Sequence, residues 1–173
     1  MENMKILAID PGTEDSAYVI WDGDRLMGGG FVANKYLLDH IPMIIQHYEI
    51  TDVPIEMIAS YGMPVGATTF ETCVWIGRFM QVAIDNQISR VEQVYRKDVK
   101  MHLCYNNRAK DSNVNQALRD RFGEKSTKKN PNLTYGDMKM NNHTWAAFAM
   151  AVYYFDTRNP RSHFNVKLQS LKR

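Results

Sequence analysis

The sequence predicts an α/β fold in which helices flank a central mixed five-stranded sheet. Three observations support this prediction. An apolar segment near the N-terminus ends on a carboxylate, a hairpin signal follows it directly, and apolar runs of strand length then alternate with segments of helical period. A hairpin brings antiparallel neighbours, whereas a helix between two strands permits parallel pairing, so the expected sheet is mixed.

The first strand is expected to end at Asp10. The run Met4-Lys5-Ile6-Leu7-Ala8-Ile9 is apolar enough to be buried, and Asp10-Pro11-Gly12 turns immediately after it. A carboxylate fixed at the end of a buried strand is costly to desolvate unless a cation or hydrogen bonds compensate it. Asp10 is therefore a candidate metal ligand, although the residue types of this tripeptide also favour a simple turn.

The next elements follow in order. Residues 16–21 read as a second strand, Asp22-Gly23 supplies the hairpin turn, and residues 25–32 read as a third strand. A helix is expected over 37–48, interrupted or started by Pro42. The fourth strand, residues 53–59, is again apolar and carries one embedded carboxylate, Glu56.

The second half of the chain is predicted to be mostly helical. A long helix over 69–84 has an apolar stripe of Phe70, Cys73, Val74, Gly77, Met80 and Ile84. A fifth strand is expected over 91–95, and a helix over 111–122 has Asp111 or Ser112 near its N-cap and Gly123 as its stop. Residues 124–132 are polar and basic and predict a mobile loop, and the final helix is expected from about 143 to 155.

The length of 173 residues suits one domain, predicted over 1–157, followed by a basic C-terminal tail over 158–173. The N-terminus passes directly into a strand, and no apolar run is long enough to cross a bilayer. We therefore expect a cytoplasmic protein without membrane contact. Cys73 and Cys104 lack the spacing of a metal site and are expected to be free thiols.

The small net charge of +2 conceals a division of the chain. Residues 1–95 hold five Lys or Arg and thirteen Asp or Glu, whereas residues 96–129 hold ten and four, and residues 130–173 hold six and two. The candidate metal ligands lie in the acidic part. An acidic site joined to a basic segment is what a nuclease needs in order to bind a polyanion, although any single Lys can equally belong to a solvated surface.

A strand that ends in Asp, two antiparallel strands, a helix and a further acid-bearing strand form the ribonuclease H-like arrangement. Within that arrangement the chain resembles the RuvC family of Holliday-junction resolvases, in particular the short RuvC-like enzymes of bacteriophages that infect Gram-positive bacteria. The resemblance rests on Ile9-Asp10-Pro11-Gly12-Thr13, Ile55-Glu56-Met57, Gly77-Arg78, Arg96-Lys97-Asp98-Val99-Lys100 and His143-Thr144-Trp145-Ala146-Ala147-Phe148-Ala149, which run in family order.

The resemblance implies a bacterial host-cell cytoplasm and a homodimer that nicks opposed strands of four-way DNA junctions, leaving a 5′ phosphate and a 3′ hydroxyl. It implies two Mg²⁺ ions per active site, for which Mn²⁺ could substitute, and no small-molecule cofactor. Asp10, Glu56 and His143 match the family's catalytic metal ligands. For DNA binding, Tyr61 corresponds loosely to an aromatic wedge at the junction centre. Lys100 matches a basic residue close to the scissile phosphate, with Lys97 and Lys110 as further backbone contacts.

The final helix departs from the family pattern. Family members carry a second ligand, an acid, three residues after the position of His143, and here that position is Ala146. Either another residue serves as a ligand, with Asp137 as a candidate, or a catalytic Asp has been lost. Three functions therefore remain open: a junction resolvase, a looser nuclease for branched DNA, and a junction-binding protein with impaired or no cleavage.

Overall fold

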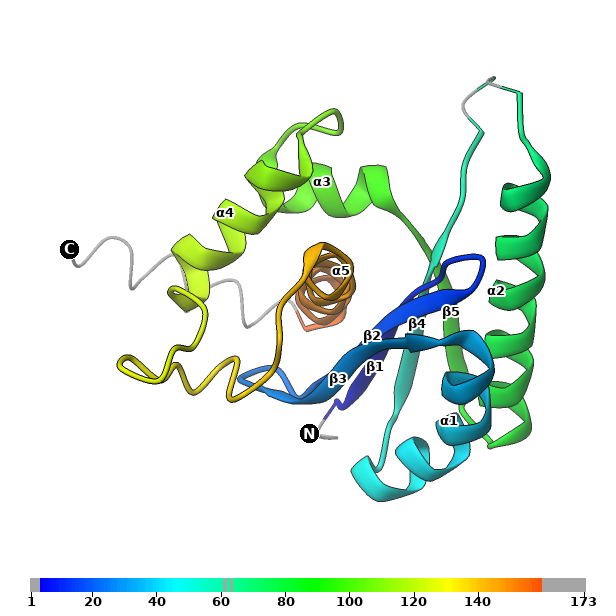
Figure 1. Ribbon diagram of the computed structural model, residues 1–173, viewed down its shortest axis with the longest axis horizontal. Coiled ribbons are helices and arrows are strands. Elements are labelled where there is room, and N and C mark those ends of the chain that lie inside the picture. Colours follow the sequence, from blue (N-terminus) through cyan, green and yellow to red (C-terminus); the bar gives the residue numbers. More distant parts are fainter. Residues whose placement is uncertain (1–3, 61, 63, 160–173) are drawn as a thin grey trace.

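The computed structural model describes residues 4–60, 62 and 64–159 and shows a mixed sheet of five strands with five helices in the described part of the chain (Figure 1). The strands are β1 (Ile6–Asp10), β2 (Asp15–Trp21), β3 (Leu26–Ala33), β4 (Asp52–Met57) and β5 (Arg90–Tyr95), in the spatial order β3-β2-β1-β4-β5. β1 pairs antiparallel with β2 and parallel with β4. The predicted mixed five-stranded sheet is confirmed.

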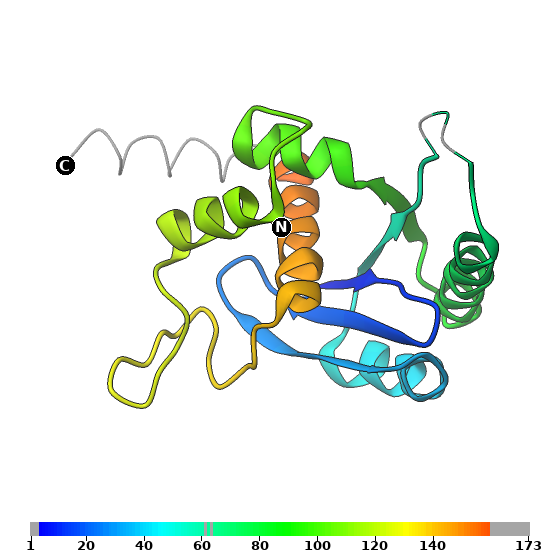
Figure 2. The same ribbon diagram turned by 45° about the horizontal axis from the view of Figure 1, so that its top comes forward.

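The helices cover both faces of the sheet. α1 (Asn34–Tyr48) and α2 (Ala67–Asp85) pack on one face, and α5 (Asn142–Arg158) packs on the other beneath α3 (Arg96–Cys104) and α4 (Asp111–Phe122) (Figures 1 and 2). Side chains of β1 alternate between the two cores: Ala8 packs with α5, whereas Leu7 and Ile9 pack with α1 and α2. Asp10 therefore points to the α5 face.

α5 is buried on almost every side, because it lies between the sheet and the α3–α4 pair (Figure 1). Ala147 and Ala151 have no exposed surface, and their small side chains permit close approach to the strands. Asn141 caps this helix: its side chain accepts a hydrogen bond from the Thr144 backbone N–H, and the Thr144 hydroxyl accepts one from the Asn141 N–H. The start of α5 is thus fixed in position.

The side of α2 that packs on the sheet is not the predicted apolar stripe. The buried residues of this helix are Thr72, Ile76, Phe79 and Ala83. Phe70, Val74 and Ile84 of the predicted stripe are instead more than half exposed, at 61%, 56% and 51%. The helix is apolar on two sides, so its period alone could not decide which side faces the sheet.

Other boundaries differ in smaller ways. α1 continues through Pro42, and α3 was not predicted as a helix. α4 has the predicted bounds and ends at Gly123, whose φ of 87° suits glycine. Asp111, however, is its first residue and makes no side-chain cap.

Tyr61 and residues 160–173 lie outside the described residues, so the wedge and nearly all of the predicted tail stay predictions. Arg158 is the last residue of α5. In the described part of the chain, no helix is long and apolar enough to span a membrane.

Candidate active site

The structure brings Asp10 and His143 together. Asp10 ends β1, and His143 lies in the first turn of α5, where its Nδ1 is 3.5 Å from Asp10 Oδ2. The Phe31 ring stacks on the His143 ring with a centroid distance of 4.8 Å and an interplanar angle of 9°. Phe31 pairs with Ala17, which in turn pairs with Asp10, so three adjacent strands place these side chains side by side.

Glu56 joins the same site from the neighbouring strand. Ile9 of β1 is in register with Ile55 of β4, and the next residue on each strand is Asp10 and Glu56. Because the two strands are parallel, both carboxylates lie at the carboxyl end of the sheet on the α5 face. Asp10 is therefore flanked by the two other residues predicted as catalytic, by Glu56 from β4 and by His143 from α5.

The two carboxyl groups carry raised pKa values. Burial raises the pKa of Asp10 to about 6, with Arg96 opposing this shift and Asp111 adding to it. Burial, followed by repulsion from Asp10, raises the pKa of Glu56 to about 7, although Arg96 acts to lower it. Two partly buried carboxylates that disfavour each other's charge form a site that a divalent cation would stabilise.

A cationic cluster adjoins the carboxylates. Arg96 donates a hydrogen bond of 3.1 Å to Glu56 Oε2 and lies 3.1 Å from Asp111 Oδ1, and Lys100 lies 3.1 Å from the same Asp111 oxygen. Partial burial acts to raise the pKa of Asp111, but Arg96 and Lys100 hold it below its ordinary value. Asp111 is not recognisable from the sequence as a neighbour of the site, because only the tertiary packing of α4 on α3 brings it there.

The donor set fits a hard divalent cation in part. Mg²⁺ prefers oxygen ligands and keeps several waters, so Asp10 and Glu56 could hold one ion, with His143 beside Asp10. Among the described residues, however, no group of three or more His, Cys, Asp or Glu is close enough to form a metal site. The arrangement therefore supplies two carboxylates to one ion and leaves a second ion with few protein ligands.

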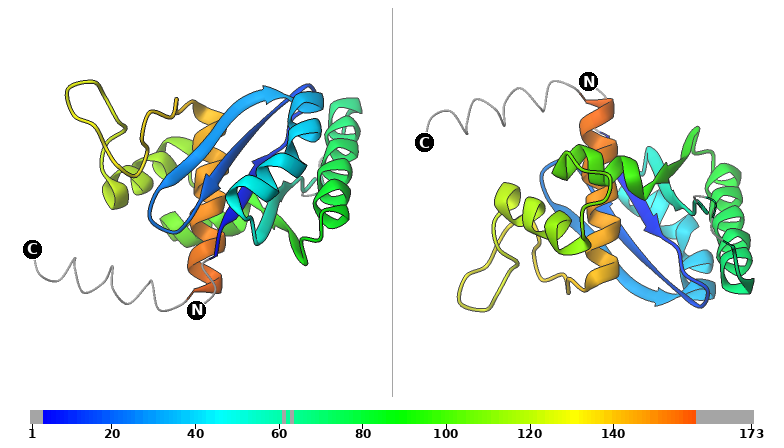
Figure 3. Two further views of the ribbon diagram at one scale, coloured as in Figure 1. Left: turned by 90° about the horizontal axis from the view of Figure 1, so that it is seen from below. Right: turned by 90° about the horizontal axis from the view of Figure 1, so that it is seen from above.

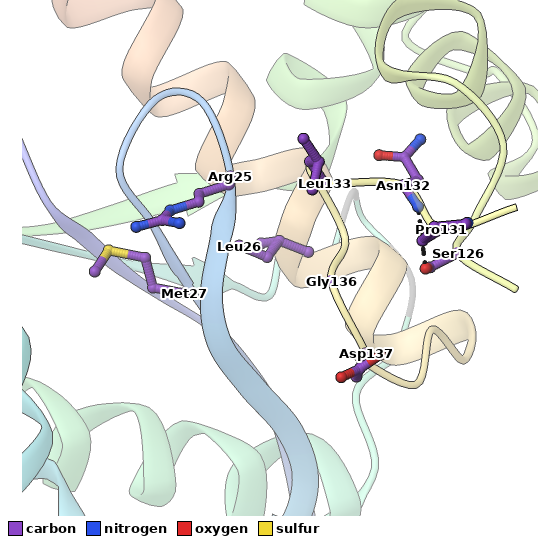
Figure 4. A pocket seen from close by; sticks show the side chains of 9 residues that line it. All are labelled: Arg25, Leu26, Met27, Ser126, Pro131, Asn132, Leu133, Gly136 and Asp137. Carbon is purple, nitrogen blue, oxygen red and sulfur yellow. Dashed lines mark hydrogen bonds between the residues drawn. The ribbon is translucent and has the colours of Figure 1, made fainter. Parts of the chain in front are cut away.

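Neither Ala146 nor Asp137 supplies the further ligand that the family pattern has. Ala146 lies one turn after His143 on the same face of α5, is only 5% exposed, and has no ligand atom. Asp137 lines a hollow between the loop before α5 and the start of β3, as Figure 4 shows, and neither Asp10, Glu56 nor His143 lines that hollow. Among the described residues, Asp137 thus forms no group with Asp10 and Glu56 that could hold a metal.

Two of the predicted DNA contacts lie beside the site. Lys97 and Lys100 line a hollow of about 410 Å³ together with Arg96, Asn107 and Arg108. Four cations around one concave surface suit a phosphate backbone. Lys110 precedes the first residue of α4, is exposed, and does not line this hollow. The sequence prediction of a basic surface next to the carboxylates thus has a structural counterpart, while the role of each lysine stays a prediction.

Comparison with known proteins shows the fold. No protein-family model matches the sequence, and no curated protein is detectably similar to it. The chain is similar in structure to Thermus thermophilus RuvC, with a TM-score of 0.67, 17% identity, and coverage of 90% of this chain and 96% of RuvC.

Two further solved structures are similar. T. thermophilus RuvC in complex with a Holliday junction substrate gives a TM-score of 0.68 at 16% identity over 87% of this chain and 92% of RuvC. The yeast mitochondrial Holliday junction resolvase Ydc2 gives 0.52 at 7% identity over 96% of this chain and 86% of Ydc2. The fold is therefore the RuvC-type, ribonuclease H-like fold.

Proposed function

We propose that this chain is a structure-selective DNA endonuclease that resolves four-way junctions by divalent-metal-dependent hydrolysis of phosphodiester bonds. The observation that carries the proposal is the meeting of Asp10, Glu56 and His143 at the carboxyl end of the sheet, on the fold of RuvC. One structural neighbour is a RuvC complex with a Holliday junction substrate, which supports junction DNA as the ligand.

Asp10 and Glu56 would hold Mg²⁺ or Mn²⁺, and His143 would complete the Asp10 side of the site. Bound metal would supply an activated water and charge stabilisation at the scissile phosphate, with two ions per site as the family arrangement. The chain's own contribution is positional. Phe31 packs against the imidazole of His143, and the cations Arg96 and Lys100 lie next to the carboxylates, where a phosphate would otherwise be repelled.

A homodimer is part of the proposal. The exposed apolar residues Phe70, Val74 and Ile84 form one side of α2 together with Gly77, and a side-chain carbon added at Gly77 would meet nothing within 4 Å. An exposed apolar helix surface with a small residue at its centre suits close packing against a second copy. Two-fold symmetry would then present two active sites to the two strands that a resolvase cuts.

A second candidate function is favoured by Ala146. A junction-binding protein with impaired or no cleavage would keep the fold and the hollow lined by Arg96, Lys97 and Lys100, but it would need no complete metal site. A looser nuclease for branched phage DNA remains a variant of the main proposal, as does the bacteriophage type with a Gram-positive host.

The proposal is tested with the variants Asp10→Asn and Glu56→Gln. Each removes one anionic ligand, so we expect weaker Mn²⁺ binding, measured by electron paramagnetic resonance, and loss of metal-dependent junction cleavage. Junction affinity in Ca²⁺ or without metal should stay within about threefold of the parent chain, because phosphate contacts come from the basic residues. Unchanged Mn²⁺ binding in both variants would show that the carboxylates are not the metal ligands.

A further inference from the structure

The basic segment between α4 and α5 forms no helix or strand, but hydrogen bonds join its backbone and side chains. Asn132 donates from its side-chain nitrogen to the carbonyl oxygens of Phe122 and Glu124, at 2.9 Å each, and its N–H donates to the Ser126 hydroxyl at 3.1 Å. The Tyr135 hydroxyl donates to the Gly123 carbonyl at 2.9 Å. We call residues 123–132 the basic turn.

The tip of the basic turn is also closed by hydrogen bonds. The Thr127 N–H donates to the Asn130 carbonyl at 3.0 Å, and the Asn130 N–H donates to the Thr127 hydroxyl at 3.0 Å. These bonds fix the backbone on either side of Lys128 and Lys129. Lysines on an ordered backbone lose less conformational freedom when they bind than lysines on a free chain do.

Three lysines of this region surround one hollow. Lys125, Lys128 and Lys139 line a depression of about 520 Å³ whose wall also includes Ser126 and Thr127. All three lysines are exposed, and none is within ion-pair distance of an acid among the described residues.

The nearby acids do not balance this charge. Glu124 lies 3.7 Å from Arg119 on α4. Among the residues that the structure describes, Asp137 is the single carboxylate in the wall of the hollow. Three cations against one anion, with two hydroxyl groups between them, suit a ligand that presents several negative charges.

Residues 138–143 connect the hollow to the candidate active site, and packing and a helix cap fix their position. Met138 packs against Gly29 of β3, where an added side-chain carbon would lie 2.9 Å from the Met138 methyl carbon. Asn141 caps α5, and His143 follows two residues later. Lys139 therefore lies only four residues before His143, so a polyanion crossing the active site could continue onto the hollow.

The basic turn also lies away from the proposed dimer surface. In Figures 1 and 3 it projects, in yellow, from the end of the molecule opposite α2. If α2 forms the dimer contact, the two basic turns stand at the outer ends of the dimer. DNA arms leave a junction outward from its centre, so an outer site is suited to an arm rather than to the branch point.

We propose that the basic turn and Lys139 bind the phosphate backbone of a duplex arm, beyond the position of cleavage. This inference rests on the proposed function for the identity of the DNA. The basic turn would then hold an arm in place, whereas the hollow lined by Arg96 and Lys100 would neutralise phosphates at the carboxylates.

The inference is tested with the triple variant Lys125→Ala/Lys128→Ala/Lys139→Ala. The control is Lys5→Gln, because Lys5 directly precedes β1 and Asp10 lies at the other end of that strand. Junction affinity is measured from about 50 to 200 mM salt on four-way junctions with arms of about 20 or about 6 base pairs. On long arms the log–log salt slope of the triple variant should fall by roughly two to three, because each lost phosphate contact lowers it by about 0.9. On short arms the triple variant and the parent chain should have the same salt slope. Lys5→Gln should have the slope of the parent chain on both arm lengths.

An unchanged slope on long arms, or an equal loss on both arm lengths, would overturn the arm contact. Linear duplex of about 20 base pairs separates this inference from the proposed function. The arm contact predicts the same drop in slope on linear duplex, whether or not the chain prefers junctions. Junction preference in the parent chain is instead the readout that belongs to the proposed function.

Discussion

At the scale of single residues, the proposed chemistry depends on Asp10, Glu56 and Ala146. The two carboxylates are partly buried next to each other, and both have raised pKa values, which is costly for folding unless a cation offsets their charge. Ala146 occupies the place on α5 where an additional oxygen ligand would complete the set. In the proposed metal site, two partly buried carboxylates would hold the ion, and one further ligand of the family pattern is absent.

Ala146→Asp tests whether a ligand has been lost. If the helix register is that of the resolvases, the new carboxylate faces Asp10 and Glu56, so Mn²⁺ affinity should rise and junction cleavage should increase by at least about tenfold. Ala149→Asp, at a similarly buried position on α5, is the control for the packing cost of a new charge. Full activity in the parent chain with no gain in Ala146→Asp would refute the lost-ligand interpretation.

The sequence was sufficient to single out Asp10 and Glu56 as candidate ligands, because a carboxylate in an apolar strand is conspicuous without any tertiary knowledge. His143 needed the family resemblance. Asp111 and Phe31 could not be found, since their roles depend on α4 packing against α3 and on the cross-strand register that places Phe31 over Ala17. Residues whose function arises from long-range contacts leave no local signal.

At the scale of elements, α3 and α4 are tied to α5 through one buried carboxylate. Asp156 accepts hydrogen bonds from Arg121 at 2.5 and 2.8 Å and contacts His102 Nε2 at 2.8 Å. Burial acts to raise the pKa of Asp156, but hydrogen bonds from Arg121 and His102 lower it to about 2. This contact holds α3, which carries Arg96 and Lys100, and α4, which carries Asp111, against the helix that carries His143.

The pH dependence of stability follows from that shift. A carboxylate whose pKa is lower in the folded state stabilises the fold above its unfolded pKa, and the contribution is lost as pH falls toward the folded value. The melting temperature should therefore drop between about pH 4 and pH 2. Asp156→Asn should be less stable near neutral pH and should lose part of this drop, whereas the exposed Asp120→Asn should follow the parent chain.

Helices and strands were predicted correctly where apolar residues lie on only one side of the element or where a local stop signal is present. The bounds of α4 and the end at Gly123 follow from local signals, and the strands alternate between two faces as expected. The prediction failed for α2, because both sides of that helix are apolar and only the position of the sheet shows which side is buried. Three residues of the predicted stripe, Phe70, Val74 and Ile84, form an exposed surface instead.

At the scale of the whole molecule, that surface predicts the assembly. Val74→Lys places a charge in the centre of the proposed dimer contact and should convert the protein to monomers in analytical ultracentrifugation. Its melting temperature at low protein concentration should change little, because Val74 is 56% exposed in the single chain. Met43→Lys, at an apolar side chain that is 59% exposed on α1, is the matched control and should leave the dimer intact.

The measurement that tests the central claim most directly is strand cleavage of a four-way junction by the parent chain with Mg²⁺ or Mn²⁺, with each strand end-labelled in turn. We expect metal-dependent nicks in two opposed strands near the branch point, with linear duplex of the same sequence left intact and Asp10→Asn inactive. Cleavage of linear duplex at the same rate, or no metal-dependent nicking by either the parent chain or Ala146→Asp, would contradict the assignment of this site as a junction-resolving nuclease.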